Sequence, residues 1–272
     1  ETMLRDRHRT ESYRDAMLAR SEDLFKGKTV LDVGCGTGIL SMFAARAGAK
    51  RVIGVDAANI IDKTREIVRV NKLDHIISLV KGKVEEISLP EDVLTVDIIV
   101  SEWMGYFLLY ESMLPSVFFA RDKWMRRSNG ISVFEACTKA GKPFSVAEVP
   151  SKTELPFAAD SLLFPDVARM FVSAVETRQM RKETQAFWKD VYGFDMTCLI
   201  TPDDAFPNAS IATLYAADKC SISDKKGLVA FDLMHDDAKD LIFESDVTLN
   251  IEKDDVIDAF TVWFDTIFSS KQ

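Results

Sequence analysis

The chain has 272 residues, of which 47% are hydrophobic and 28% charged, so a packed core is expected and an intrinsically disordered chain is excluded. That length suits one large domain or two small ones. The net charge of −9 argues against a nucleic-acid-binding protein, which usually carries a basic surface, and it suits either a basic partner or simple solubility. No apolar run is long enough to predict a membrane span.

Helix and strand signals alternate through the first half of the chain. The expected helices span residues 9–25, 39–48, 59–71 and 112–125, and the expected strands span residues 29–34, 51–56, 76–82 and 96–102. Thr10 suits the N-cap of the first helix, and Pro115 suits the first turn of the last one. Short apolar strands that alternate with helices predict an α/β fold with a parallel sheet covered on both faces.

The pattern changes in the second half. Residues 131–161 contain three prolines and no clean hydrophobic period, which indicates an irregular insert. Residues 243–251 alternate between apolar and polar side chains, as a half-buried antiparallel strand does, and residues 256–268 indicate a more buried strand. We therefore predict an α/β domain over residues 1–128 and a β-rich domain over residues 129–272.

Cysteines and histidines give no sign of a metal site. The four cysteines form no Cys-x-x-Cys pair and the three histidines are scattered, so we expect neither bound zinc nor a redox motif. Reduced thiols favour a cytoplasmic or nuclear location. The first residue is Glu1 rather than Met and no signal peptide is apparent, so the sequence can be a piece of a longer chain.

Residues 31–38, LDVGCGTG, place three glycines between a predicted strand and a predicted helix, where α/β sheets bind nucleotides. The dinucleotide fingerprint needs glycines at relative positions 1, 3 and 6, but when Gly34 and Gly36 are aligned, Ile39 occupies the sixth position. The loop therefore favours a nucleoside over a pyrophosphate. A tight turn without a ligand would use the same glycines.

Two acidic segments follow the glycine loop. Asp56 ends the next strand, 20 residues after Gly36, where an acid can accept hydrogen bonds from ribose hydroxyls. The segment GKVEE, residues 82–86, follows the third strand and could meet an adenine amino group. The alternative role of Asp56 is to cap a helix or to end a strand in solvent, and the glycine loop favours the ribose role. Taken alone, residues 82–86 would more often be a solvated turn.

The stretch SEWMGYFLLYE, residues 101–111, sets Glu102 and Glu111 in a run of mostly apolar side chains. Together with the glycine loop, this stretch resembles the type I branch of the S-adenosylmethionine-dependent protein arginine N-methyltransferases, whose double-glutamate loop is a specific motif. The resemblance covers residues 1–125 and resumes over residues 162–196. It is greatest to the branch whose members carry an amino-terminal zinc finger.

The resemblance implies a fold class and a division of the chain. It implies a Rossmann-like domain that binds S-adenosylmethionine, followed by a partial β-barrel domain that carries the atypical insert and, at residues 176–209, a helical dimerisation arm. Phe187, Trp188 and Tyr192 would anchor that arm on a second subunit, or else pack internally. Family members also have a tyrosine-rich helix before the point where this sequence starts, and further strands with a Thr-His-Trp loop after the point where it stops. We therefore expect the C-terminal part of the barrel to be absent from this sequence.

The resemblance also implies the site. Glu102 and Glu111 would be the catalytic pair that grips the substrate guanidinium. The implied cofactor-binding residues are Arg9 for the methionine carboxylate, Asp32, Gly34 and Gly36 under the methionine moiety, Asp56 for the ribose, and Val84 and Glu85 for the adenine. The implied reaction pocket is lined by Met3, Tyr106 and Met113. Asp56 is a departure, since the family usually has glutamate there.

The chemistry of arginine explains why such a site needs two acids. A guanidinium stays charged because its pKa lies above about 12, and delocalisation makes it a poor nucleophile. Two carboxylates can hold it through charge-assisted, bidentate hydrogen bonds and draw its positive charge towards two nitrogens, which leaves the third freer to attack. Glutamates that merely flank a helix are the alternative explanation of Glu102 and Glu111.

Two functional classes remain open at this stage. One is a homodimeric arginine methyltransferase that makes asymmetric dimethylarginine in basic protein substrates, for example Arg/Gly-rich segments, ribosomal proteins or histones, with no direct nucleic-acid or membrane partner. The other is a catalytically inactive or truncated relative that binds the cofactor or a dimer partner. A small-molecule methyltransferase is a third reading, and the acidic double-glutamate loop argues against it.

Overall fold

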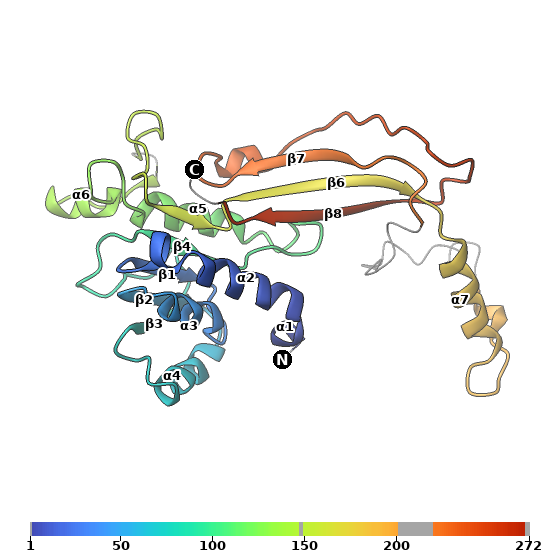
Figure 1. Cartoon of the computed structure of the whole chain (residues 1–272), viewed down its shortest axis with the longest axis horizontal. Helices are drawn as coiled ribbons and strands as arrows, with labels where there is room; N and C mark the ends of the chain where they lie inside the picture. The colour runs from blue at the N-terminus through green and yellow to red at the C-terminus, as the bar shows by residue number, and fades with distance from the viewer. Residues whose placement is uncertain (1, 147–148, 201–219, 270–272) are drawn as a thin grey trace.

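The computed structural model describes residues 2–146, 149–200 and 220–269. Figure 1 shows a parallel sheet with helices packed around it at one end of the molecule. A long antiparallel sheet extends from that end, and helix α7 projects from the far end of this second sheet. Within these ranges, none of the helices is long and apolar enough to cross a membrane.

The first part of the chain alternates helices and strands, as predicted. Its helices are α1 (Thr2–Arg5), α2 (Arg7–Ala19), α3 (Ile39–Arg46), α4 (Ile60–Val70), α5 (Leu114–Trp124) and α6 (Val133–Lys139). Its strands are β1 (Thr29–Val33), β2 (Arg51–Asp56), β3 (Ile77–Lys81), β4 (Ile98–Val100) and β5 (Leu162–Phe164). Asp6, rather than the predicted Thr10, caps α2, because the Asp6 carboxylate accepts the amide N–H of Arg9 at 3.1 Å.

The five strands form one sheet in the order β3-β2-β1-β4-β5, and all neighbouring pairs are parallel. Every residue of β1 is buried, as expected of a central strand that is covered on both faces. Because parallel strands point the same way, the loops that follow β1, β2, β3 and β4 meet at one edge of the sheet. This Rossmann-like arrangement brings the glycine loop and Glu102 to the same edge.

The parallel sheet continues beyond the boundary expected at residue 128. Strand β5 lies against β4, with Leu162, Leu163 and Phe164 paired to its three residues. Residues 131–161 are therefore an excursion that returns the chain to its own sheet, and we place the domain boundary near residue 165. The excursion is also partly regular, because Ser132 Oγ accepts the amide N–H of Glu135 at 3.0 Å and caps α6.

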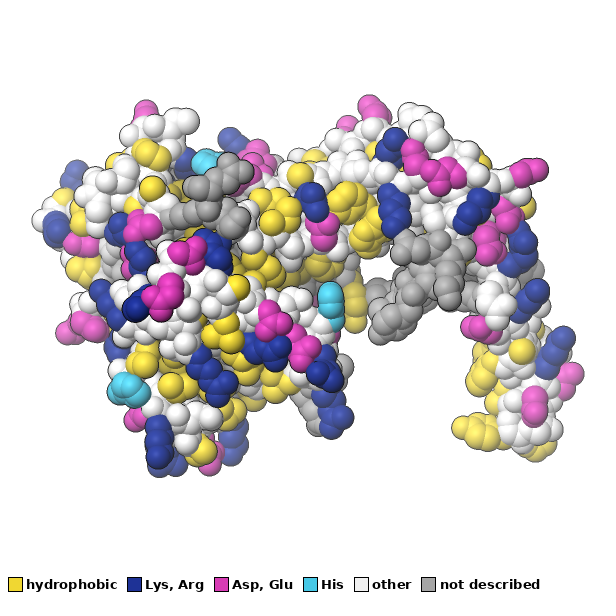
Figure 2. Space-filling view, viewed as in Figure 1, with side chains coloured by type: hydrophobic (Ala, Val, Ile, Leu, Met, Phe, Trp, Pro, Cys, Tyr) yellow, Lys and Arg dark blue, Asp and Glu magenta, His cyan; other side chains and the backbone are white. Residues whose placement is uncertain are grey.

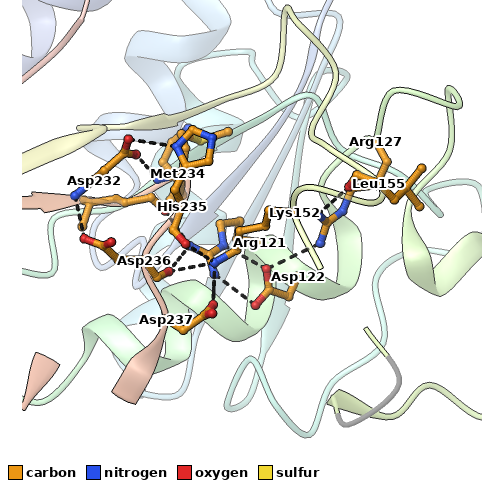
Figure 3. A network of polar contacts seen from close by, with 12 residues as sticks. Arg121, Asp122, Arg127, Lys152, Leu155, Asp232, Met234, His235, Asp236 and Asp237 are labelled. Atoms are coloured by element: carbon orange, nitrogen blue, oxygen red, sulfur yellow. Dashed lines mark hydrogen bonds and ion pairs between the residues drawn. The ribbon is translucent and has the colours of Figure 1, made fainter. Parts of the chain in front are cut away.

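Side chains of this excursion fasten the parallel-sheet domain to the loop after β7 (Lys226–Asp232), as Figure 3 shows. Lys152 donates to the Asp237 carboxylate at 2.5 Å and to two neighbouring backbone carbonyls at 2.6 and 3.0 Å. Arg121 of α5 donates to the same carboxylate at 3.1 Å. We call Arg121, Lys152 and Asp237 the junction cluster. Beside it, the buried Arg127 guanidinium lies 3.8 Å from the centre of the Phe157 ring.

Lys152→Met is expected to lower the free energy of unfolding by about 2 kcal/mol. The Lys152 side chain is 12% exposed, and its loss removes one buried donor that Asp237 and two backbone carbonyls share, although Arg121 still donates to Asp237. Urea denaturation measures the change. The matched control is Lys139→Met on α6, where the lysine is 62% exposed and pairs with Glu135, and its expected effect is below about 0.5 kcal/mol. Equal effects in the two variants would contradict a fastening role for the junction cluster.

The second sheet has the order β7-β6-β8, with β6 (Val167–Val175) in the centre and both neighbours antiparallel to it. Strand β8 (Ala259–Ile267) confirms a strand within residues 256–268, but the expected burial is wrong, because its residues are half-buried or exposed. The strand predicted over residues 243–251 is wrong, because residues 243–250 have no strand structure and Ile251 makes an isolated bridge with Ser223. A segment with alternating apolar and polar residues forms a strand only where a neighbouring strand offers free backbone groups for hydrogen bonds. Here the Asn250 amide donates instead to a side chain, the Asp224 carboxylate.

Helix α7 (Arg178–Lys189) stands away from both sheets (Figure 1). The side chains of Phe187 and Tyr192 are 58% and 97% exposed, so these two predicted anchors do not pack internally. The Trp188 ring lies 5.1 Å from the Phe187 ring. Figure 2 shows apolar side chains at the tip of this arm, and such exposed apolar surface is typical of a protein interface. Residues 201–209 of the predicted arm lie outside the described ranges.

Candidate active site

A cavity of about 930 Å³ opens where the loops after β1, β2, β3 and β4 meet, and its size falls within the roughly 300–1,000 Å³ usual for small-molecule sites. Ten of the predicted site residues line it: Met3, Arg9, Gly34, Gly36, Asp56, Val84, Glu85, Glu102, Glu111 and Met113. Two predicted residues, Asp32 and Tyr106, lie outside the lining. Most of the predicted site residues therefore line the cavity, although they make up less than half of its wall.

The glycine loop uses its own amide groups for internal hydrogen bonds. The amides of Gly34 and Cys35 both donate to the carbonyl of Val55, at 2.9 and 3.0 Å, and the amide of Gly36 donates to Asp56 Oδ2 at 2.7 Å. A phosphate-binding loop instead points free amides at its ligand. The geometry therefore fits a nucleoside better than a pyrophosphate.

Gly34 allows the glycine loop to touch the far side of the cavity. Its φ is 75°, and a Cβ placed on it would lie 2.4 Å from Cε of Met113. Any side chain at this position would therefore both strain the backbone and displace Met113. The close approach joins the glycine loop to the segment that carries Glu111.

Asp56 faces the cavity although it is tied to the glycine loop. Besides the bond from Gly36, its Oδ1 accepts the amide N–H of Ala58 at 2.8 Å. Because each carboxylate oxygen can accept a second hydrogen bond, Asp56 retains capacity for ribose hydroxyls. Further along the wall, Glu85 Oε1 accepts the hydroxyl of Ser116 at 2.5 Å, so this residue of α5 fixes one of the acids expected near the adenine.

Asp32 lies beneath the glycine loop rather than in the cavity wall. Its side chain is buried, Oδ2 accepts the hydroxyl of Ser41 at 2.6 Å, and Oδ1 has no partner in the described residues. Burial raises the pKa of Asp32 to about 7, against the lowering effect of the Ser41 hydrogen bond. Asp32 is therefore not placed to contact a ligand in the cavity directly.

The raised pKa of Asp32 makes stability depend on pH. The folded protein keeps a proton that the unfolded chain releases above about pH 4, so this contribution is complete below pH 4 and is lost as the pH rises through 7. Between pH 5 and pH 7.5 the wild type should lose about 2 kcal/mol relative to Asp32→Asn, which does not titrate. Urea denaturation at both pH values measures this. The exposed Asp74→Asn is the control, and parallel behaviour of Asp32→Asn and wild type would contradict the prediction.

Glu102 already binds a guanidinium in this structure. Arg9 Nη1 lies 2.9 Å from Glu102 Oε2, and Arg9 Nη2 donates to the carbonyl of Met3 at 2.7 Å. The side chain of Glu102 is 18% exposed. Burial raises the pKa of Glu102, the charge of Arg9 opposes that rise, and the charge of Glu111 adds to it. Arg9, for which the resemblance implies a contact with the cofactor carboxylate, is thus found against the first glutamate.

The loop between the two glutamates follows an unusual backbone path. Phe107 and Leu108 in this loop have positive φ values of 53° and 59°, and so does Ser112 directly after it, with a φ of 54°. The buried Leu108 side chain anchors the middle of the loop. Glu111 is exposed on the open side of the cavity, where it packs against Gly105. A Cβ on Gly105 would lie 2.5 Å from Cγ of Glu111.

Tyr106 does not occupy the place that the resemblance implies. It is 58% exposed and lies outside the cavity lining, because the turn that starts at Gly105 directs it outwards while Leu108 points inwards. Sequence reasoning also missed Tyr13, which lines the cavity from α2. Its position one helical turn after Arg9 is a signal that could have found it.

Residues 166–272 match the family described as the arginine methyltransferase oligomerization subdomain, and residues 14–109 match ribosomal protein L11 methyltransferase (PrmA). Protein arginine N-methyltransferase 1 of Schizosaccharomyces pombe is 43% identical over 99% of this chain and 68% of its own length. Protein arginine N-methyltransferase 1 of Dictyostelium discoideum is 40% identical over 99% of this chain and 67% of its own length. The chain belongs to the protein arginine N-methyltransferase family.

Solved structures of the family share the fold. A chain of the Trypanosoma brucei PRMT1 enzyme–prozyme heterotetrameric complex with AdoHcy is 40% identical, with a TM-score of 0.72 over 98% of this chain and 72% of that one. The PRMT6–SAH structure is 26% identical, with a TM-score of 0.70 over 98% of this chain and 79% of that one. The oligomerization match begins at residue 166, immediately after β5, which agrees with a domain boundary near residue 165.

Proposed function

We propose that this member of the family transfers a methyl group from S-adenosylmethionine to the guanidinium nitrogens of arginine side chains in proteins. One observation carries the proposal: Glu102 and Glu111 line the same cavity as the glycine loop, and Glu102 holds a guanidinium, that of Arg9, at 2.9 Å. The cavity therefore offers a place for a nucleoside beside a place for a cationic side chain. The relatives named arginine N-methyltransferase support the same reaction.

The residues of the cavity fit S-adenosylmethionine. The glycine loop has the internally bonded amides of a loop that binds no phosphate, Asp56 can accept ribose hydroxyls, and the buried Val84 offers an apolar contact to adenine. Arg9 would bind the methionine carboxylate. When bound, the cofactor supplies an electrophilic methyl group on a positively charged sulfur.

The two glutamates bind and orient the substrate. Carboxylates on either side of a guanidinium form charge-assisted hydrogen bonds that hold one nitrogen towards the methyl group, and orientation of this kind can contribute roughly 7–11 kcal/mol to lowering the barrier. The positive charge of the bound guanidinium offsets the repulsion between Glu102 and Glu111. The raised pKa of Glu102 suits it to accept the proton that the nitrogen loses.

The net charge of the chain supports basic protein substrates, and its helical arm supports a dimer. A net charge of −9 attracts basic protein substrates such as Arg/Gly-rich segments, ribosomal proteins or histones, on which we expect asymmetric dimethylation. Residues 166–272 match the family's oligomerization subdomain, and the exposed Phe187 and Tyr192 on the described part of the arm offer apolar contacts. A homodimer is the assembly that we propose.

Isotope-labelled S-adenosylmethionine and an Arg/Gly-rich peptide test the proposed reaction. Mass spectrometry should show mass additions of one and two methyl groups on arginine, with fragments of asymmetric dimethylarginine. The same peptide with lysine in place of each arginine is the control and should stay unmodified. If S-adenosylhomocysteine binds but no methylarginine forms under any peptide concentration, the chain is an inactive relative and the proposal fails.

A further inference from the structure

Helix α2 contacts the double-glutamate loop at two levels, one helical turn apart. Arg9 and Tyr13 are four residues apart and therefore share a face of the helix. Arg9 binds the carboxylate of Glu102, and the Tyr13 hydroxyl donates to the backbone carbonyl of Ser101 at 2.9 Å. One helix face thus holds the side chain of Glu102 and the backbone immediately before it.

Ser101 is held from its other side as well. Its hydroxyl donates to the carbonyl of Val33 at 2.8 Å, and Val33 is the last residue of β1, directly before the glycine loop. Ser101 is buried, so neither bond competes with bulk water. The backbone that carries Glu102 is therefore fixed between α2 and the end of β1.

Of the two contacts from α2, a substrate can displace the one made by Arg9 but not the one made by Tyr13. Arg9 is 26% exposed at its side chain and faces the cavity, so a substrate guanidinium can replace it on Glu102. Tyr13 is 2% exposed, and its ring packs edge-on against Phe268 at 4.8 Å between centres. Burial, and then the charge of Glu102, raise the pKa of Tyr13 well above its usual value, so its hydroxyl keeps the proton that it donates.

We propose that Tyr13 is a positioning residue that, through the carbonyl of Ser101, keeps Glu102 directed into the cavity when Arg9 releases it to a substrate arginine. This rests on the proposed function, because it assigns Tyr13 to the substrate half of that site. Tyr13 itself touches neither reacting atom. The hydrogen bond from its hydroxyl to the Ser101 carbonyl can remain intact during turnover, whereas the ion pair between Arg9 and Glu102 has to break.

Tyr13→Phe tests the proposal because it keeps the ring and its apolar contacts and removes the hydroxyl. The expected result is a fall in kcat of about tenfold on the arginine peptide, with the Kd of S-adenosylhomocysteine within about twofold of wild type. Tyr110→Phe is the matched control: Tyr110 sits on the same loop, is 77% exposed, and its variant should behave as wild type. A loss of cofactor affinity equal to the loss of kcat would indicate a general structural role and overturn the proposal.

A double-variant cycle shows whether Tyr13 acts through Glu102. Measured as the Kd of the arginine peptide with S-adenosylhomocysteine present, Tyr13→Phe should weaken binding about fivefold in the wild type and in Glu111→Gln, and should have no further effect in Glu102→Gln. A weakening in Glu102→Gln as large as that in the wild type would overturn the proposal. This measurement requires peptide binding but no methyl transfer. If the wild type proves inactive, the proposed reaction is contradicted, but the effect of Tyr13→Phe on peptide binding can still be measured.

Hydrogen exchange provides a measurement that requires neither activity nor peptide. In Tyr13→Phe the backbone amides of residues 101–111 should exchange about five to ten times faster than in the wild type, while those of the glycine loop stay unchanged. Unchanged exchange over residues 101–111 would mean that the hydroxyl does not hold the loop, and the proposal would fail even if kcat fell.

Discussion

Glu111→Gln is expected to reduce methyl transfer to arginine by at least about a hundredfold while the protein stays folded. Glutamine keeps the shape of the side chain but removes the charge, so one of the two charge-assisted contacts to the guanidinium is lost where charge has to be redistributed in the transition state. Glu111 is exposed, so its replacement leaves no buried group without a partner. The measurement is kcat with an Arg/Gly-rich peptide.

The control for this experiment is Glu91→Gln, which removes an equally exposed acid away from the cavity and should leave kcat unchanged. The Kd of S-adenosylhomocysteine should also stay unchanged in Glu111→Gln, since the glycine loop and Asp56 are intact. A Glu111→Gln protein with wild-type kcat would show that the guanidinium is not held by this residue, and the assignment of the catalytic pair would have to be abandoned.

Gly105→Ala is expected to lower kcat/KM for the peptide by at least about tenfold. The added Cβ would lie 2.5 Å from Cγ and 3.0 Å from the amide nitrogen of Glu111, and neither atom is the flexible end of a side chain. The loop must therefore shift and move Glu111 away from its place in the cavity wall. The φ of Gly105 is one that alanine can adopt, so displacement rather than backbone strain is the cause.

Gly227→Ala is the matched control for Gly105→Ala, because a Cβ on Gly227 in β7 meets nothing within 4 Å and the residue also has no positive φ. Both variants should bind S-adenosylhomocysteine as the wild type does. Wild-type kcat/KM in Gly105→Ala would mean that the position of Glu111 seen here is not the one used in turnover.

Local pattern predicts strands β1 to β4 of the parallel sheet because each is an apolar run with a glycine, an acid or a turn at its end. Strands β1 and β2 appear within one residue of their expected ends. The sequence fails where pairing with a distant segment decides the outcome. Strand β5 has only three residues, and it is a strand because the free edge of β4 receives it after a long excursion. Residues 243–250 alternate correctly but form no ladder in the described structure.

The site shows the same division. The glycine loop, Glu102 and Glu111 could be found because each is marked by its own neighbours in the sequence. Contacts that span much of the domain could not be found, among them Arg9 with Glu102 and Tyr13 with Ser101, because nothing near either partner signals the other. The outward direction of Tyr106 depends on the turn over Gly105–Leu108, with positive φ at Phe107 and Leu108, which the sequence does not signal.

In the ion pair between Arg9 and Glu102, a guanidinium of the chain itself occupies the carboxylate that a substrate arginine would use. An arriving arginine exchanges one guanidinium for another, so the net gain on docking is smaller than the strength of the new contacts alone. When the carboxylate of S-adenosylmethionine binds Arg9, it removes this competitor from Glu102 before the substrate arrives. Binding of the cofactor would then free Glu102 for the substrate arginine, and the return of Arg9 to Glu102 would favour release of the methylated arginine.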